Sequence, residues 1–236
     1  MSDRKSQFGV QIPSPVVRYY TWGSEKKSFK YYDKGEGTDK LVFPLSFVFL
    51  TSRATVRGWH DLSQSSIYAN LVKNSGKEVL NVKSSKPDSK GNTLLATGIY
   101  RDIKGNLAGG HFEKVVFGYE EGVGVIQINI KGSGLSSFST FEKENKNLFD
   151  NYITINKFEE LKKGATKYSV PNFVLGEKVE EQVDKLANDA YKELDAYFIA
   201  KSKVSTSERD EYEADHETGE QEVHPLLVES GDDLPF

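Results

Sequence analysis

The sequence contains no cysteine. Disulfide bonds and thiolate-bound metal sites are therefore excluded, and a reducing compartment is favoured. It also has no run of about 18 apolar residues, the length that a membrane-spanning helix needs. Residues 1–5 lack the apolar region of a signal peptide. Together these absences predict a cytoplasmic protein that does not contact a membrane.

The chain also has little of what enzymes use for catalysis. It has four histidines, of which His216 and His224 lie near the C-terminus. The others are His60 and His111, and we interpret His60 beside Asp61 as structural rather than as a catalytic dyad. No phosphate-binding loop or dinucleotide fingerprint is present. We therefore predict no enzymatic activity, no bound metal and no cofactor. A nuclease that holds its metal with carboxylates alone stays an alternative.

Charge is divided unevenly along the chain, and its net value of -4 hides this division. Residues 206–236 contain eleven acids and one base, Arg209, which gives -10. Subtracting them from the totals of 31 bases and 35 acids leaves 30 bases and 24 acids in residues 1–205, or +6. A basic body with an acidic end is typical of proteins that bind nucleic acids.

Apolar alternation and turn residues predict a mostly β domain. Strands are expected where short apolar or alternating runs are separated by Gly-rich or polar turns. These runs cover residues 41–43, 47–50, 54–59, 79–82, 94–100, 114–119, 123–130, 152–156 and 166–174. Gly58 is expected at a bulge or bend, and residues 120–122 in a hairpin turn. Many short strands with such turns indicate a sandwich or a barrel.

Two helices and two disordered ends complete the predicted organisation. A short helix is expected at residues 133–145 and a long one at about 177–201, where apolar residues recur at helical spacing. The long helix packs either on its own domain or on another subunit of a homo-oligomer, and both alternatives stay open. Residues 1–15 are expected to form a flexible arm. Residues 204–236 have too little hydrophobicity to order themselves, so the domain spans residues 16–203.

Aromatic and basic residues are concentrated near the start of this domain. Residues 18–34 contain six aromatic and five basic side chains. Unpaired bases stack on aromatic rings, while Lys and Arg neutralise phosphates, so the cluster predicts a face that binds single-stranded DNA. The alternative is that half of the rings fill the core, as alternation along a strand implies. The candidate DNA contacts in this cluster are Arg18, Tyr19, Tyr20, Trp22, Lys26, Lys27, Phe29, Lys30, Tyr31 and Tyr32.

A second group of rings and bases follows along later strands and extends the same predicted groove. The alternative is that these residues have a structural role instead, since a ring such as Trp59 beside Gly58 could also be part of the core. The group consists of Arg53, Arg57, Trp59, Tyr68, Lys73, Tyr100 and Arg101. Three further lysines, Lys162, Lys163 and Lys167, are interpreted either as a solvated face or as phosphate contacts.

The C-terminal tip has the composition of a peptide ligand. Two acids precede a short apolar group and a terminal Phe, so one residue combines an aromatic ring with the chain's free carboxylate. A basic pocket with an apolar floor captures both through charge pairing and ring burial. The alternative is an acidic end without a role. The predicted partner-binding residues are Asp232, Asp233, Leu234, Pro235 and Phe236.

The tip resembles that of bacterial single-stranded DNA-binding proteins, with Leu234 where those proteins usually carry Ile. The body, over about residues 16–160, resembles a phage-encoded single-stranded DNA-binding family with an OB-fold. This second resemblance rests on residues 29–34, 54–61, 66–73 and 95–100. It implies an OB-fold-like barrel with added helices and, if the protein is viral, the host cytoplasm. The core motifs of the bacterial proteins are not recognisable, so their tetramer is not implied.

These patterns predict a protein that coats and protects single-stranded DNA during replication, recombination or repair. Its tip is expected to recruit replication or repair enzymes. Its acidic tail is expected to compete with DNA for the basic groove, because the two carry opposite charge. The alternative from another class is a β-rich interaction module of a virion or host complex that binds protein or glycan and has no role on DNA.

Overall fold

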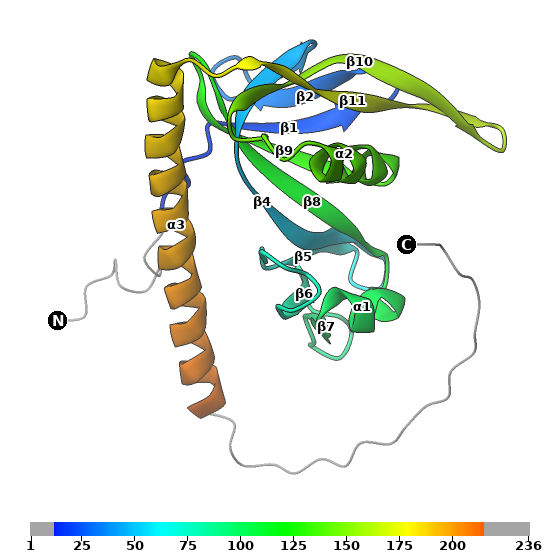
Figure 1. Ribbon diagram of the computed structural model, residues 1–236. Helices are drawn as coiled ribbons and strands as arrows, with labels where there is room; N and C mark the ends of the chain where they lie inside the picture. Colours follow the sequence, from blue (N-terminus) through cyan, green and yellow to red (C-terminus); the bar gives the residue numbers. More distant parts are fainter. Residues whose placement is uncertain (1–11, 215–236) are drawn as a thin grey trace. The chain divides into compact units, whose positions relative to one another are not determined.

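Alternating apolar and β-branched residues build one mixed sheet in the computed structural model, which describes residues 12–214 and the side chains of residues 12–202. Residues 13–197 form one unit, and the described residues 12 and 198–214 belong to a second unit. The strands (Figure 1) are β1 (Arg18–Gly23), β2 (Ser28–Asp33), β3 (Thr38–Val42), β4 (Leu45–His60), β5 (Ser65–Ala69), β6 (Leu80–Ser84), β7 (Leu94–Gly98), β8 (Gly110–Glu120), β9 (Gly124–Lys131), β10 (Asn151–Lys163) and β11 (Thr166–Lys178). The helices are α1 (Tyr100–Ile103), α2 (Ser133–Glu144) and α3 (Glu181–Ala214), with a 3-10 turn at Lys104–Asn106.

The sheet is open. Its strands follow the order β3-β2-β1-β9-β8-β4-β5-β6-β7, while β10 joins through β4 and carries β11 on its other side. β1 and β9 run parallel, whereas the hairpin pairs such as β8 with β9 are antiparallel. The mostly β fold with a C-terminal helix is confirmed. The closed barrel is not formed, because β3 and β7 stay at the two ends of the path, and an OB-fold is therefore not confirmed.

The length of β4 explains why the sheet branches instead of closing. This strand has 16 residues and pairs with β10 near its start, with β8 along its middle and with β5 at its end. The separate strands expected at 47–50 and 54–59 are thus one strand, and its pairing irregularity lies between Phe49 and Thr51 rather than at Gly58. Gly58 serves another purpose, since a Cβ there would lie 2.3 Å from the carbonyl oxygen of Gly109.

Other expectations from the sequence hold to different degrees. The hairpin turn between β8 and β9 and the short helix α2 are confirmed. β5 was not expected, because its sequence has only one strongly apolar residue, Ile67. α3 begins at Glu181, after β11 has continued to Lys178, and it extends to Ala214 instead of ending near residue 201. Residues 204–214, which were expected to be disordered, are therefore helical, because a helix already nucleated upstream extends easily through residues such as Glu and Arg.

Side chains alternate between two faces of the sheet, and different elements cover each face. The back face carries Tyr20 and Val56. At one end of it, α2 and the β10–β11 hairpin enclose the main core, whose large members include Tyr20, Phe29, Phe47, Ile128, Phe138, Ile153 and Phe173. At the other end, α1 covers a second core formed by Ala54, Val56, Ile67, Val72, Leu80, Val82, Ile103 and Leu107.

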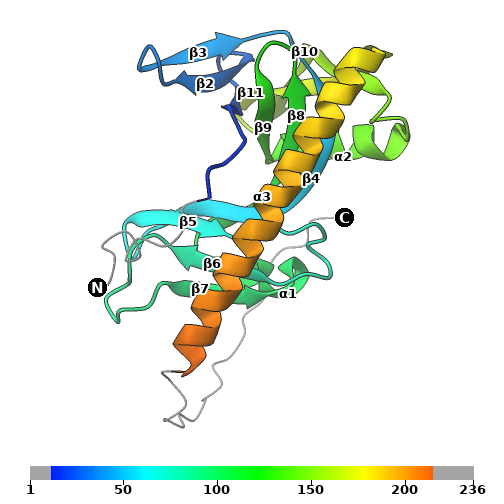
Figure 2. The same cartoon turned by 90° about the vertical axis from the view of Figure 1, so that its left-hand side faces the viewer.

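The front face carries Arg53 and Arg57. Residues 181–197 of α3 pack on its middle, as Figure 2 shows for β4 and β8. Val183, Ala187 and Leu194 are buried there. The helix therefore covers the centre of the front face, while the ends of the sheet formed by β1–β3 and by β5–β7 keep exposed aromatic side chains.

Candidate nucleic-acid interface

Four exposed side chains lie together on the front face of β4, β5 and β6. Arg57 and Trp59 are two residues apart on β4, so they share one face. Tyr68 on β5 lies directly opposite Arg57, and Lys83 on β6 lies directly opposite Tyr68. The ring of Trp59 is 50% exposed and that of Tyr68 is 48% exposed. We call Arg57, Trp59, Tyr68 and Lys83 the ring-base face.

Burial of the intervening residues holds this face in place. Val56, Ile67 and Val82 alternate with the ring-base residues and lie in the second core. A shift of one residue in strand pairing would expose these apolar side chains and bury Arg57 or Lys83. The register is therefore strongly specified, and the rings and cations stay on the solvent side.

A buried carboxylate lies next to the guanidinium of this face. Glu113 on β8 is 5% exposed, and its Oε2 lies 3.7 Å from Nε of Arg57. Its Oε1 lies 3.1 Å from Nε2 of His111, the residue opposite Arg57 on β8. Oε2 of Glu113 has no hydrogen-bond partner among the described residues. The carboxylate thus forms an ion pair with Arg57 without a hydrogen bond, and it offsets part of the positive charge of this guanidinium.

The structure divides the first predicted cluster, residues 18–34, between core and surface. Tyr20 and Phe29 are fully buried in the main core, which agrees with the alternative that half of the rings fill the core. The hydroxyl of Tyr20 donates a hydrogen bond of 2.7 Å to Glu120, and burial is the main cause that raises its pKa. Trp22 packs on Phe29 and donates from Nε1 to the backbone oxygen of Ser169 at 2.9 Å. These three rings build the fold and do not face solvent as stacking platforms.

The exposed members of the same cluster lie on β1, on β2 and in the turn between them. Tyr19 is 46% and Tyr32 is 61% exposed, and Lys26 is also exposed. Their basic neighbours are largely engaged within the chain. Lys30 forms an ion pair of 2.7 Å with Asp39, while Lys27 forms one with Glu160.

Arg18 and Tyr31 face each other beside the core rather than solvent. The guanidinium carbon of Arg18 lies 4.6 Å from the ring centroid of Tyr31. A nitrogen of Arg18 also lies 3.7 Å from Glu120. The β1–β2 hairpin therefore offers two exposed rings but fewer available cations than its sequence suggests.

Several residues of the second predicted group lie apart from the ring-base face. Arg53 is buried beneath α3, donates to Oγ1 of Thr51 at 3.0 Å, and has its pKa lowered mainly by that burial. Tyr100 lies on the back face, where its ring centroid is 4.7 Å from that of Phe112 and burial raises its pKa. Arg101 on α1 and Lys73 after Val72 are exposed, but neither belongs to β4, β5 or β6.

Sequence reasoning missed three residues in or next to the ring-base face. Lys83 belongs to the face, His111 lies beside Arg57, and the exposed Leu94 lies opposite Lys83 on β7. The signal for Lys83 was present, because Leu80, Val82 and Ser84 are the inward positions of β6. The expected strand at residues 79–82 ended one residue before Lys83, and this hid the alternation.

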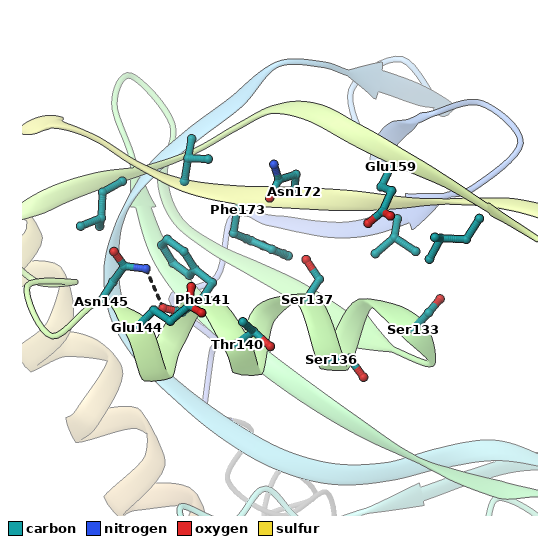
Figure 3. A pocket seen from close by; sticks show the side chains of 14 residues that line it. Ser133, Ser136, Ser137, Thr140, Phe141, Glu144, Asn145, Glu159, Asn172 and Phe173 are labelled. Carbon is teal, nitrogen blue, oxygen red and sulfur yellow. Dashed lines mark hydrogen bonds between the residues drawn. The ribbon is translucent and has the colours of Figure 1, made fainter. Parts of the chain in front are cut away.

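A groove lies between α2 and the β10–β11 hairpin, beside the main core (Figure 3). It encloses about 660 Å³ and is lined by hydroxyls of α2, by apolar residues of the hairpin and by the polar side chains of Glu144, Asn145, Glu159 and Asn172. Ser137 donates to the backbone oxygen of Pro171 at 2.9 Å. A serine nucleophile needs an adjacent base, and neither histidine nor lysine lines the groove.

The described part of the chain lacks two further features. In this part, no group of three His, Cys, Asp or Glu side chains is placed to hold a metal ion. None of the helices in residues 12–214 is long and apolar enough to cross a membrane. The predicted partner-binding residues, Asp232 to Phe236, lie outside the described residues.

Comparisons of the chain with protein-family models, with curated proteins and with solved structures found no match. Its function is therefore inferred from the geometry of its own residues.

Proposed function

We propose that this protein binds single-stranded DNA through the ring-base face. The observation that carries the proposal is the placement of two half-exposed rings, Trp59 and Tyr68, beside the cations of Arg57 and Lys83 in adjacent register positions. Rings offer flat surfaces to bases, and the cations lie within the same row to meet phosphates. The proposal requires an exposed sheet face, not a closed barrel.

The chemistry of the face favours unpaired over paired strands. Bases in a duplex are already stacked on one another, whereas unpaired bases are free to stack on a side chain. Such stacking contributes about 1–3 kcal/mol per base and tolerates any sequence. Trp59 and Tyr68 are therefore suited to a protein that coats single strands without reading their sequence, as replication, recombination and repair require.

Charge supports the same function. The basic body of residues 1–205 carries +6, and phosphate neutralisation by Lys and Arg releases counterions from the nucleic acid. Binding is expected to weaken steeply as salt concentration rises. A face that binds protein or glycan through the same rings would show a weaker dependence on salt.

Fluorescence anisotropy with labelled oligo-dT and with a matched duplex tests the proposal. We expect oligo-dT to bind more tightly than the duplex at equal salt concentration. Equal affinity for both, or no binding to oligo-dT at low salt, would contradict single-strand binding. The second outcome would favour the interaction module that binds protein or glycan.

We further propose that the acidic tail recruits partner enzymes and competes with DNA. Residues 215–236 contain seven acids and neither Lys nor Arg. Deleting them leaves α3 whole, because this helix ends at Ala214. The deletion is expected to tighten oligo-dT binding and to abolish partner recruitment. Unchanged DNA affinity would show that the tail does not shield the ring-base face.

A further inference from the structure

The β10–β11 hairpin is firmly anchored at its middle to other parts of the sheet. Ser169 of β11 accepts the indole hydrogen bond of Trp22 and forms two more, each of 2.6 Å, with Ser24 in the β1–β2 turn. Phe158 of β10 packs on Phe43, with 6.0 Å between ring centroids. These contacts therefore hold the hairpin on the rest of the sheet as far as Phe158 on β10 and Ser169 on β11.

Beyond these anchors the hairpin continues as a two-stranded ribbon. Leu161 pairs with Tyr168, Lys162 with Lys167, and Lys163 with Thr166. Figure 1 shows the end of this hairpin extending past the strands to which it is anchored. We call residues 161–168 the ribbon tip. It contains three exposed lysines and no acidic residue.

The lysines of the ribbon tip repel one another. Lys162 and Lys167 lie directly opposite on adjacent strands, and like charges in that position destabilise a sheet. The nearest acid along the strand, Glu160, is already paired with Lys27. This pairing is the main cause that lowers the pKa of the Glu160 carboxyl group, and Lys167 makes a smaller contribution. Within residues 12–202, none of the three tip lysines forms an ion pair. An anionic ligand would relieve this repulsion.

We propose that the ribbon tip binds the phosphate backbone of duplex DNA adjoining the single strand on the ring-base face. A two-stranded ribbon fits the major groove of B-form DNA. The only ring of the tip, Tyr168, is half-buried, so the tip offers charge to phosphates rather than a stacking platform to unpaired bases. This inference rests on the proposed function. It implies that the protein recognises junctions between single-stranded and double-stranded DNA.

The test compares the affinity of the full chain for oligo-dT with its affinity for the same oligo-dT joined to a duplex. The unmodified protein is expected to bind the junction more tightly. The triple variant Lys162→Glu, Lys163→Glu, Lys167→Glu is expected to lose that preference while its affinity for oligo-dT alone changes little. In a plot of the logarithm of junction affinity against the logarithm of salt concentration, the steepness of the slope should decrease by about 1 for each lysine that no longer contacts a phosphate.

A matched variant controls for net charge. Lys143→Glu, Lys146→Glu and Lys185→Glu reverse three exposed lysines elsewhere and should keep the junction preference. Loss of preference in this control to the same extent would overturn the inference. The milder triple variant Lys162→Gln, Lys163→Gln, Lys167→Gln removes the positive charges without reversing them. Circular dichroism of this variant shows whether it is folded, which separates loss of binding from loss of folding.

The outcomes for the unmodified protein distinguish the two proposals. Tight oligo-dT binding without any junction preference would overturn the role of the ribbon tip and leave the proposed function standing. No binding to oligo-dT would instead contradict the proposed function itself.

Discussion

Tyr68 on β5 lies directly opposite Arg57 on β4, and both side chains point to solvent from the front of the sheet. On its other side Tyr68 faces Lys83 of β6. A base stacked on this ring would therefore have a cation on either side for its flanking phosphates. This arrangement is absent from the β1–β2 hairpin, where Lys30 and Lys27 are held by acids of the chain.

Removing either ring of the ring-base face should weaken DNA binding without unfolding the protein. Trp59→Ala and Tyr68→Ala are each expected to cost about 1–3 kcal/mol of binding free energy, the usual contribution of one stacked base. The affinity for labelled oligo-dT, measured by anisotropy, checks this. Phe149→Ala is the matched control, since Phe149 is 59% exposed but lies outside the ring-base face. An equal loss of affinity in the control would refute the assignment.

Tyr20 should behave in the opposite way, because its ring is buried. Tyr20→Phe removes the hydrogen bond that the hydroxyl donates to Glu120. Hydrogen bonds to charged groups contribute about 1.5–3 kcal/mol, so the free energy of unfolding should fall by about that amount. Urea unfolding measures this loss, and oligo-dT affinity should stay unchanged. A weakened affinity with unchanged stability would place Tyr20 at the DNA instead of in the core.

Neutralising the carboxylate beneath the face should strengthen DNA binding. Glu113→Gln keeps the shape of the side chain but removes the negative charge 3.7 Å from Arg57. Charges about 4 Å apart interact by about 1 kcal/mol in water and by more where one of them is buried, so oligo-dT affinity should rise by about fivefold or more. Glu142→Gln is the control, because Glu142 pairs with Lys114 on the opposite face. Weaker oligo-dT binding by Glu113→Gln would show that positioning of Arg57 outweighs charge.

The sequence predicted local structure better than it predicted the sheet. The turn at residues 120–122 and the helix α2 follow from short-range patterns, and both are present. Closure of the sheet depends on which distant strands meet. β4 pairs with its sequence neighbour β5, but also with β8 and β10, which lie far along the chain. No local pattern predicts these two distant pairings, which is why an open sheet replaces the expected barrel.

The candidate site shows the same limit. Clustering of rings and bases identified Arg57, Trp59 and Tyr68, but it also selected Tyr20 and Phe29, which are core residues. Alternation predicts that every second side chain points inward, but it does not predict which face of the sheet other elements cover. That depends on α2 and on the β10–β11 hairpin, which pack over Tyr20 and Phe29 from later in the chain.

Tryptophan fluorescence tests the central claim most directly, since the chain has only two tryptophans, Trp22 and Trp59. Trp22→Phe leaves Trp59 as the single reporter on the ring-base face, and Trp59→Phe leaves Trp22, which packs against the core. Titration of the Trp22→Phe variant with oligo-dT should quench the fluorescence of Trp59 as bases stack on its ring, with the same midpoint as binding measured by anisotropy. The Trp59→Phe variant should show little quenching. If oligo-dT binds the Trp22→Phe variant and leaves the emission of Trp59 unchanged, DNA binds elsewhere and the account is wrong.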